Sequence, residues 1–139
     1  MAFGSANKEN AWCGAFVHWI LESVGAPTLD YGNDKYNLTR ARAYKEYGQA
    51  SSRPFFGSIA VKGSSHVGFV AGINKSETHV ILLGGNQCKL GMSKATVVNY
   101  SAYPIGNFTA FRIPHETNTN IPVVIFENTT GINFGGSTR

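Results

Sequence analysis

The feature that most constrains this chain is a change of hydrophobic periodicity near Pro54. Before it, residues 11–24 (AWCGAFVHWILESV) repeat apolar side chains every three or four positions, which is typical of an amphipathic helix. After it, short runs rich in β-branched residues are separated by Gly, Ser and Asn, which is typical of strands joined by turns. Helices first and strands afterwards favour an α+β fold with an antiparallel sheet over alternating βαβ units.

The first predicted helix has signals at both ends. Asn10 is a candidate N-cap, and Gly25 is a typical residue at which a helix stops. A second, shorter helix is predicted over 39–47 (TRARAYKEY) and ends at Gly48. Cys13 is therefore expected in the first turn of the first helix.

The rest of the chain reads as a sheet with an extension. Five strands are predicted, over residues 57–62, 66–73, 78–83, 95–100 and 107–113. Residues 115–139 are rich in Thr and Asn with one apolar run, IPVVIF, and are expected to form an extra strand or an irregular C-terminal extension. We expect a single domain over residues 1–139 with a sheet of about five to six strands.

Composition excludes several classes of protein. Hydrophobic residues make up 42% of the 139 residues and charged residues only 14%, which is typical of a chain with a real core and not of a disordered one. The net charge of +4 is spread thinly, with only Arg40, Arg42 and Lys45 close together, so nucleic-acid binding is not expected. No apolar run approaches the roughly eighteen residues of a membrane span, and the first residues lack the apolar segment of a signal peptide.

The two cysteines do not form a disulfide framework. One bridge between Cys13 and Cys88 is possible, and two free thiols are the alternative. The chain has no CxxC pair and no HExxH motif, so we expect neither a metal site nor a cofactor.

Cys13 is the candidate nucleophile. The thiolate is the reactive form of cysteine, and a place in the first turn of a helix lowers the thiol pKa, because unpaired N–H groups stabilise the anion. The alternative is a buried core cysteine, since free cysteine is among the most buried residue types. Position alone leaves both interpretations open.

A cysteine nucleophile needs a nearby base, and His66 is the candidate. It opens the strand pattern HVGFVAG, so it would stand at the mouth of the sheet, where it can face a helix N-terminus. His18 lies about 140° round the helix axis from Cys13, which places it poorly. His79 begins another strand, and His115 lies in the polar C-terminal region.

Asn86 is the candidate for the group that orients the base. A hairpin of the second and third predicted strands would bring Asn86 beside His66. Its amide oxygen would accept the Nδ1 proton and leave Nε2 facing Cys13. Gln87 has the opposite strand parity and is the weaker choice, and a plain Gly-Gly-Asn turn is the structural alternative.

Taken together, these residues resemble a known family. Residues 10–113 resemble the papain-like cell-wall hydrolases of the CHAP and NlpC type. Four segments carry the resemblance, in this order along the chain: WCGAFVHWILESVGAP, ARAYKEYG, FGSIAVKGSSHVGFVAGI and VILLGGNQ. The resemblance implies an N-terminal helix that carries the catalytic cysteine and packs on an antiparallel sheet. It also implies cleavage of amide bonds in the peptide stems or cross-links of peptidoglycan, with Cys13 as nucleophile, His66 as base and Asn86 as the orienting residue.

The chain departs from that family in three places. Only twelve residues precede Cys13, Ser58 stands where many relatives carry Asp, and residues 115–139 fall outside the resemblance. A substrate groove could be lined by Trp12 and by the loop 28–37, which contains Tyr31 and Tyr36.

Small single-domain versions of the family resemble amidase effectors injected into rival bacteria by type VI secretion. This implies synthesis in the cytoplasm without a signal peptide, action in the periplasm or cell wall of a target cell, and a cognate immunity protein that blocks the site. The alternatives are a phage or bacterial lysin of the same chemistry, a cysteine acyltransferase or protein-cleaving peptidase, and a catalytically inactive wall-binding or interaction domain.

Overall fold

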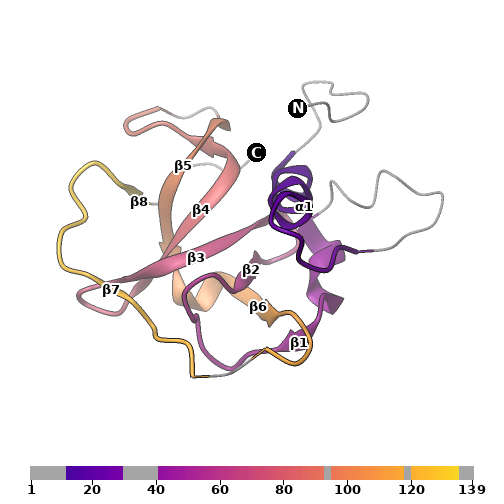
Figure 1. Cartoon of the computed structure of the whole chain (residues 1–139). Helices are drawn as coiled ribbons and strands as arrows, with labels where there is room; N and C mark the ends of the chain where they lie inside the picture. The colour runs from indigo at the N-terminus through magenta and orange to yellow at the C-terminus, as the bar shows by residue number, and fades with distance from the viewer. Residues whose placement is uncertain (1–11, 30–40, 93–94, 118–119, 135–139) are drawn as a thin grey trace.

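The computed structural model describes residues 12–29, 41–92, 95–117 and 120–134 (Figure 1). Its α-helix, α1 (Cys13–Ser23), begins at Cys13 itself, as the periodicity predicts to within two residues. The cap prediction is wrong, because Trp12 holds the position before the helix and makes no side-chain capping hydrogen bond. Asn10 lies outside the described residues. Gly25 ends the helix with φ of +74°, a backbone conformation that glycine adopts without strain.

A short 3₁₀ helix, η2 (Ala41–Glu46), stands where the second helix was predicted, and Gly48 follows it with φ of +51°. Two tyrosines tie this segment to α1. The Tyr44 hydroxyl donates to the carbonyl oxygen of Gly14 at 3.2 Å, and the Tyr47 hydroxyl donates to that of Pro27 at 2.7 Å. One hydrogen bond thus joins η2 to the first turn of α1, and the other joins the residue after η2 to the segment that follows α1.

All five predicted strands are present, and three two-residue strands join them. The strands are β1 (Gln49–Ala50), β2 (Ile59–Lys62), β3 (His66–Asn74), β4 (His79–Cys88), β5 (Ala95–Pro104), β6 (Phe108–Ile113), β7 (Ile125–Phe126) and β8 (Asn133–Phe134). A further 3₁₀ turn, η3 (Ile105–Asn107), joins β5 to β6.

The described part of the chain forms one mixed sheet of eight strands, in the order β1-β6-β2-β3-β4-β5-β8, with β7 paired to β3. The α+β class is confirmed. The expectation of an antiparallel sheet with five to six strands is wrong, because β7 and β8 from the C-terminal segment pair in parallel with β3 and β5. The segment read as an extension of uncertain structure thus adds strands to the same sheet.

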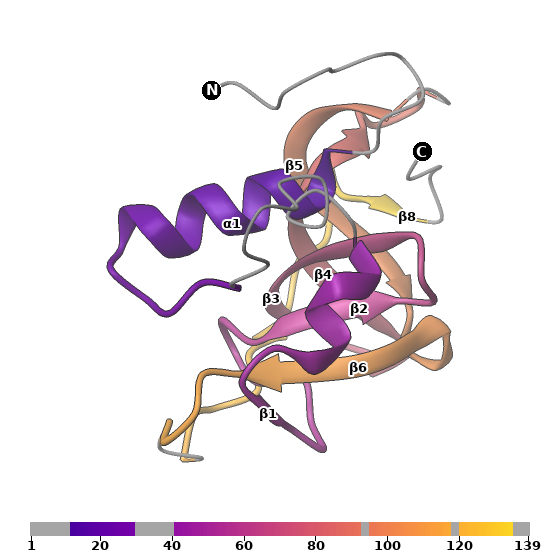
Figure 2. The same cartoon turned by 90° about the vertical axis from the view of Figure 1, so that its right-hand side faces the viewer.

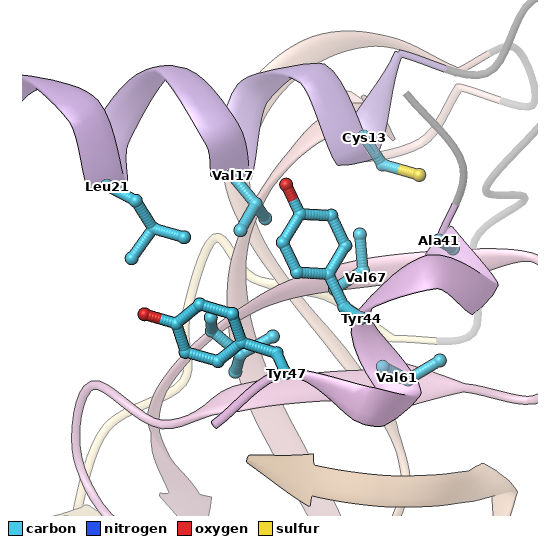
Figure 3. Close-up of a cluster of buried hydrophobic side chains, with 9 residues drawn as sticks. Cys13, Val17, Leu21, Ala41, Tyr44, Tyr47, Val61 and Val67 are labelled. Carbon is cyan, nitrogen blue, oxygen red and sulfur yellow. The ribbon is translucent and has the colours of Figure 1, made fainter. Parts of the chain in front are cut away.

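The helix lies against one face of this sheet, with η2 beside it (Figure 2). The cluster between them contains buried side chains from α1, η2 and the strands (Figure 3): Cys13, Val17, Leu21, Ala41, Tyr44, Tyr47, Ile59, Val61 and Val67. A second cluster lies on the opposite face, because Ala60 alternates with Ile59 and Val61 along β2. It includes Tyr103, whose hydroxyl belongs to the polar site described next.

Candidate active site

Cys13 is the first residue of α1 and is fully buried, with 0% of its surface exposed. Burial raises the pKa of its thiol, while the backbone N–H groups of Val67, Gly14 and Cys13 itself act in the opposite direction. Two of these groups belong to the first turn of α1, whose N–H groups have no partner within a helix. The third belongs to β3, one residue after His66. The sulfur therefore lies where the start of α1 meets the start of β3.

His66 begins β3 and is also fully buried, with 0% of its surface exposed. Burial lowers its pKa to about 4; the hydrogen bond that His66 donates to Gln87 acts to raise the pKa, and the charge of Lys62 adds to the lowering. Its ring packs edge-on against the ring of Tyr103, with centroids 5.7 Å apart. At neutral pH the imidazole in this structure is therefore uncharged.

Gln87 decides which nitrogen of His66 carries the proton. The amide nitrogen of Gln87 donates to the backbone oxygen of Asn99 at 2.7 Å and to its side-chain oxygen at 2.9 Å. A flipped amide would place oxygen against oxygen, so Oε1 must be the atom that lies 2.8 Å from His66 Nε2. That oxygen only accepts, so His66 Nε2 donates and Nδ1 is left as a bare acceptor.

Within the described residues, Nδ1 of His66 has no hydrogen-bond partner, although it is buried. No hydrogen bond in this part of the chain joins it to Cys13. The Cys13 thiol thus approaches the backbone of Val67, whereas the His66 ring packs on Tyr103, and the two side chains are not engaged with each other. In this resting arrangement both the thiol and the imidazole are neutral.

The prediction for Asn86 is wrong in both the residue and the ring nitrogen. Gln87, not Asn86, binds the imidazole, and it does so through Nε2 and not Nδ1. The cause is a bulge in β4, where the register with β5 shifts between Gly84 and Gln87 and Asn86 takes φ of +58°. An extra residue reverses the side-chain alternation, so parity counted from a regular strand selects the wrong neighbour.

The pair Gly84 and Gly85 gives this bulge the space that it needs. A Cβ atom on Gly84 would lie 2.7 Å from Gln87 Oε1 and 3.3 Å from His66 Nε2. A Cβ atom on Gly85 would lie 2.6 Å from the indole of Trp12. One glycine therefore leaves room for the imidazole–amide contact, and the next lets the start of α1 approach the sheet. Trp12, predicted to line a groove, packs on this backbone, whereas Tyr31 and Tyr36 lie outside the described residues.

Two residues of this site were missed from the sequence. The Tyr103 hydroxyl donates to Gln87 Oε1 at 3.2 Å, and burial raises its pKa, while a hydrogen bond with Ser101 acts in the opposite direction. The ammonium of Lys62 lies 4.6 Å from the centre of the Tyr103 ring. The only sequence signal for Lys62 is its place in the tight hairpin that precedes His66.

The remaining cysteine and histidines are placed differently. Cys88 is buried, and the possible disulfide bridge between Cys88 and Cys13 is not formed. His18 lies 3.7 Å from Glu22 on α1. The ring of His79 packs on Phe134. His66 is thus the histidine that directly precedes Val67, whose backbone the Cys13 thiol approaches.

The described residues contain no group of three or more His, Cys, Asp or Glu side chains placed to hold a metal ion. Across the same ranges, no helix has the length and apolar character needed to cross a membrane. Comparison of the chain with protein-family models, with characterised proteins and with solved structures finds no match.

Proposed function

We propose that this chain is a cysteine amidase in which Cys13 is the nucleophile, His66 the proton carrier and Gln87 the orienting residue. The observation that carries the proposal is the fixed tautomer of His66. Gln87 occupies Nε2, which leaves Nδ1 as an acceptor at the start of β3, where the thiol of Cys13 approaches the N–H of Val67. The backbone of Val67, which the Cys13 thiol approaches, directly follows His66 in β3, and this adjacency supports the pairing of the two residues.

The reaction would proceed in two acyl-transfer steps. His66 Nδ1 takes the thiol proton as the sulfur of Cys13 attacks the amide carbonyl carbon, and backbone N–H groups at the start of α1 stabilise the oxyanion. The C–N bond then breaks, and the imidazolium gives its proton to the leaving amine. Water attacks the resulting thioester with His66 as base, which releases a carboxylic acid and regenerates the thiol.

The burial of both groups sets the conditions for this chemistry. With the thiol pKa raised and the imidazole pKa lowered, a preformed thiolate–imidazolium pair is disfavoured. Proton transfer would therefore accompany attack instead of preceding it. Because both side chains have 0% exposure, the substrate must also displace part of the surrounding chain before it reaches the sulfur.

We infer the substrate class from the motif resemblance alone, which supports a papain-like hydrolase of the NlpC and CHAP type. The proposed substrate is therefore an amide bond in a peptidoglycan stem peptide or cross-link. Delivery by type VI secretion to the periplasm of a rival cell, with a cognate immunity protein, belongs to the same proposal. A phage or bacterial lysin is the alternative route to the same bond.

A second candidate function is a binding domain that keeps the fold without catalysis. The full burial of Cys13 within an apolar cluster is the observation that favours it. Such a domain would bind the wall or a partner protein and leave peptidoglycan uncut. The two candidates differ in whether Cys13 is needed for any chemical change.

Digestion of purified peptidoglycan, followed by mass spectrometry of the muropeptides, tests the proposal. The wild type should release shortened stems or separated cross-links, and Cys13→Ala and His66→Ala should release none while keeping their circular dichroism spectra. Cys88→Ala and His79→Ala are the matched controls and should keep most of the activity. Unchanged digestion by Cys13→Ala would refute the assignment, and no digestion by the wild type would favour the binding domain.

A further inference from the structure

Lys62 places a positive charge beside the candidate site. It is the last residue of β2 and stands opposite His66 in the register between β2 and β3. Its ammonium lies 4.6 Å from the centre of the Tyr103 ring. The same ring packs edge-on against the imidazole of His66, with the two ring centroids 5.7 Å apart. A single aromatic ring thus connects the ammonium to the imidazole.

This ammonium has no acidic partner in the part of the chain that the structure describes. The ion pairs found there join Lys75 to Glu127 and His18 to Glu22. Lys62 is also half-buried, and this loss of water lowers its pKa. The face of Tyr103 offsets part of that cost through a cation–π contact, but it leaves the N–H donors of the ammonium without a carboxylate.

We propose that Lys62 binds a carboxylate of the substrate, so that the enzyme acts on amides that carry a free carboxylate close to the scissile bond. This inference rests on the proposed function, because Cys13 and His66 define where the scissile bond lies. A carboxylate would supply the acidic partner that the described residues do not provide. It would also be the part of the substrate that positions the carbonyl for attack.

Binding of that carboxylate has a consequence for the base. The charge of Lys62 is one of the causes that keep the pKa of His66 low. A bound carboxylate would cancel this charge, so His66 would accept the Cys13 proton more readily when a substrate is in place. The imidazole of His66 would then be a weaker base in the empty site than in the site occupied by an acidic substrate.

Alkylation of Cys13 by two reagents of similar size measures this anchor directly. Iodoacetate carries a carboxylate and iodoacetamide carries a neutral amide, and peptide mass spectrometry separates labelling at Cys13 from labelling at Cys88. The ratio of the two rate constants cancels any change in thiolate population. The full chain is compared with Lys62→Gln, Lys62→Arg and, as a matched control at the far end of β3, Lys75→Gln.

We expect Lys62→Gln to lower the iodoacetate-to-iodoacetamide rate ratio at Cys13 about fivefold at low salt, and less at high salt. Lys62→Arg, which keeps the charge, and Lys75→Gln should leave the ratio within about twofold of the wild type. A ratio unchanged in Lys62→Gln would overturn the carboxylate anchor and leave the amidase proposal standing. Absence of labelling at Cys13 by either reagent in the folded protein would overturn both.

Discussion

The imidazole of His66 donates from Nε2 to Gln87 Oε1 across 2.8 Å, and this contact sets the chemical state of the whole candidate site. The amide nitrogen of Gln87 is already committed to the two oxygens of Asn99. Its oxygen cannot exchange places with that nitrogen, so the proton stays on Nε2 and the lone pair stays on Nδ1. Gln87 therefore decides which ring nitrogen of His66 is left to accept a proton.

Replacing Gln87 by a side chain of similar length that forms no hydrogen bonds should lower the stability of the protein and allow His66 to adopt both tautomers. Gln87→Met leaves the buried Nε2 donor of His66 without an acceptor and removes the hydrogen bonds of Gln87 to Tyr103 and to the half-buried Asn99, so we expect the free energy of unfolding to fall by about 2–4 kcal/mol. Urea denaturation measures this loss. Nitrogen-15 NMR of the imidazole should show a mixture of tautomers in place of one.

The neighbouring asparagine supplies the control for that experiment. Asn86 has φ of +58°, a conformation that glycine adopts without cost. Asn86→Gly should therefore keep the single His66 tautomer seen in the wild type. If Asn86→Gly scrambles the tautomer and Gln87→Met does not, the assignment of the orienting residue is reversed.

Burial of His66 should make the protein less stable in mild acid. Its pKa falls from 6.5 in the unfolded chain to about 4 in the fold, so the unfolded state binds more protons between these values. The contribution of the neutral ring is complete above pH 6.5 and is lost as the pH falls towards 4, by about 3 kcal/mol at most. Lys62 and Tyr103, which face the ring, keep their charge states across this window.

Urea denaturation at several pH values from 7 to 4.5 tests this dependence in the wild type and in His66→Gln. The wild type should lose stability more steeply on acidification than the variant. Parallel slopes would mean that His66 takes up its proton in the folded state as easily as in the unfolded one.

The contact between Gly85 and Trp12 should tolerate no added methyl group. In Gly85→Ala the new Cβ would lie 2.6 Å from the Trp12 ring and 2.8 Å from Phe16 Cβ, so the start of α1 must move. Such overpacking costs about 1–3 kcal/mol. Gly106→Ala is the matched control, because nothing lies within 4 Å of its added Cβ, and equal thermal shifts for the two variants would contradict the packing described.

The Tyr44 hydroxyl should contribute measurably to holding the first turn of α1. Tyr44→Phe keeps the buried ring and removes the donor to Gly14 O, so we expect a loss of about 1 kcal/mol in urea. Hydrogen exchange of the amides in the first turn of α1 should speed up as well. Tyr100→Phe, at a side chain that is 48% exposed, should change neither measurement.

The sequence was informative where a pattern is local. Helical periodicity predicts α1 to within two residues at its start, and β-branched runs predict every strand longer than two residues. Both predictions are correct because each pattern requires only that one face of the helix or strand is buried. The positions of Cys13 at the start of α1 and His66 at the start of β3 follow from the same local rules.

What the sequence did not reveal depends on contacts between distant segments. The bulge before Gln87 shifts strand parity, and nothing in the run GGNQ says which of its two amides will face His66. Lys62 gains its importance from Tyr103, which lies three strands away along the chain. The 0% exposure of Cys13 is likewise a property of the assembled layers and not of its own helix turn.

The short strands β7 and β8 make the last part of the described chain a component of the sheet and of its packing. Phe126 and Ile132 cover a small cluster formed by Ala71, Ile81 and Ala102, and β8 borders β5. Truncation after residue 113, where the family resemblance stops, would uncover that cluster and expose the outer edge of β5. The shortest segment expected to fold independently therefore extends to residue 134, and a fragment chosen by motif alone would be prone to aggregate.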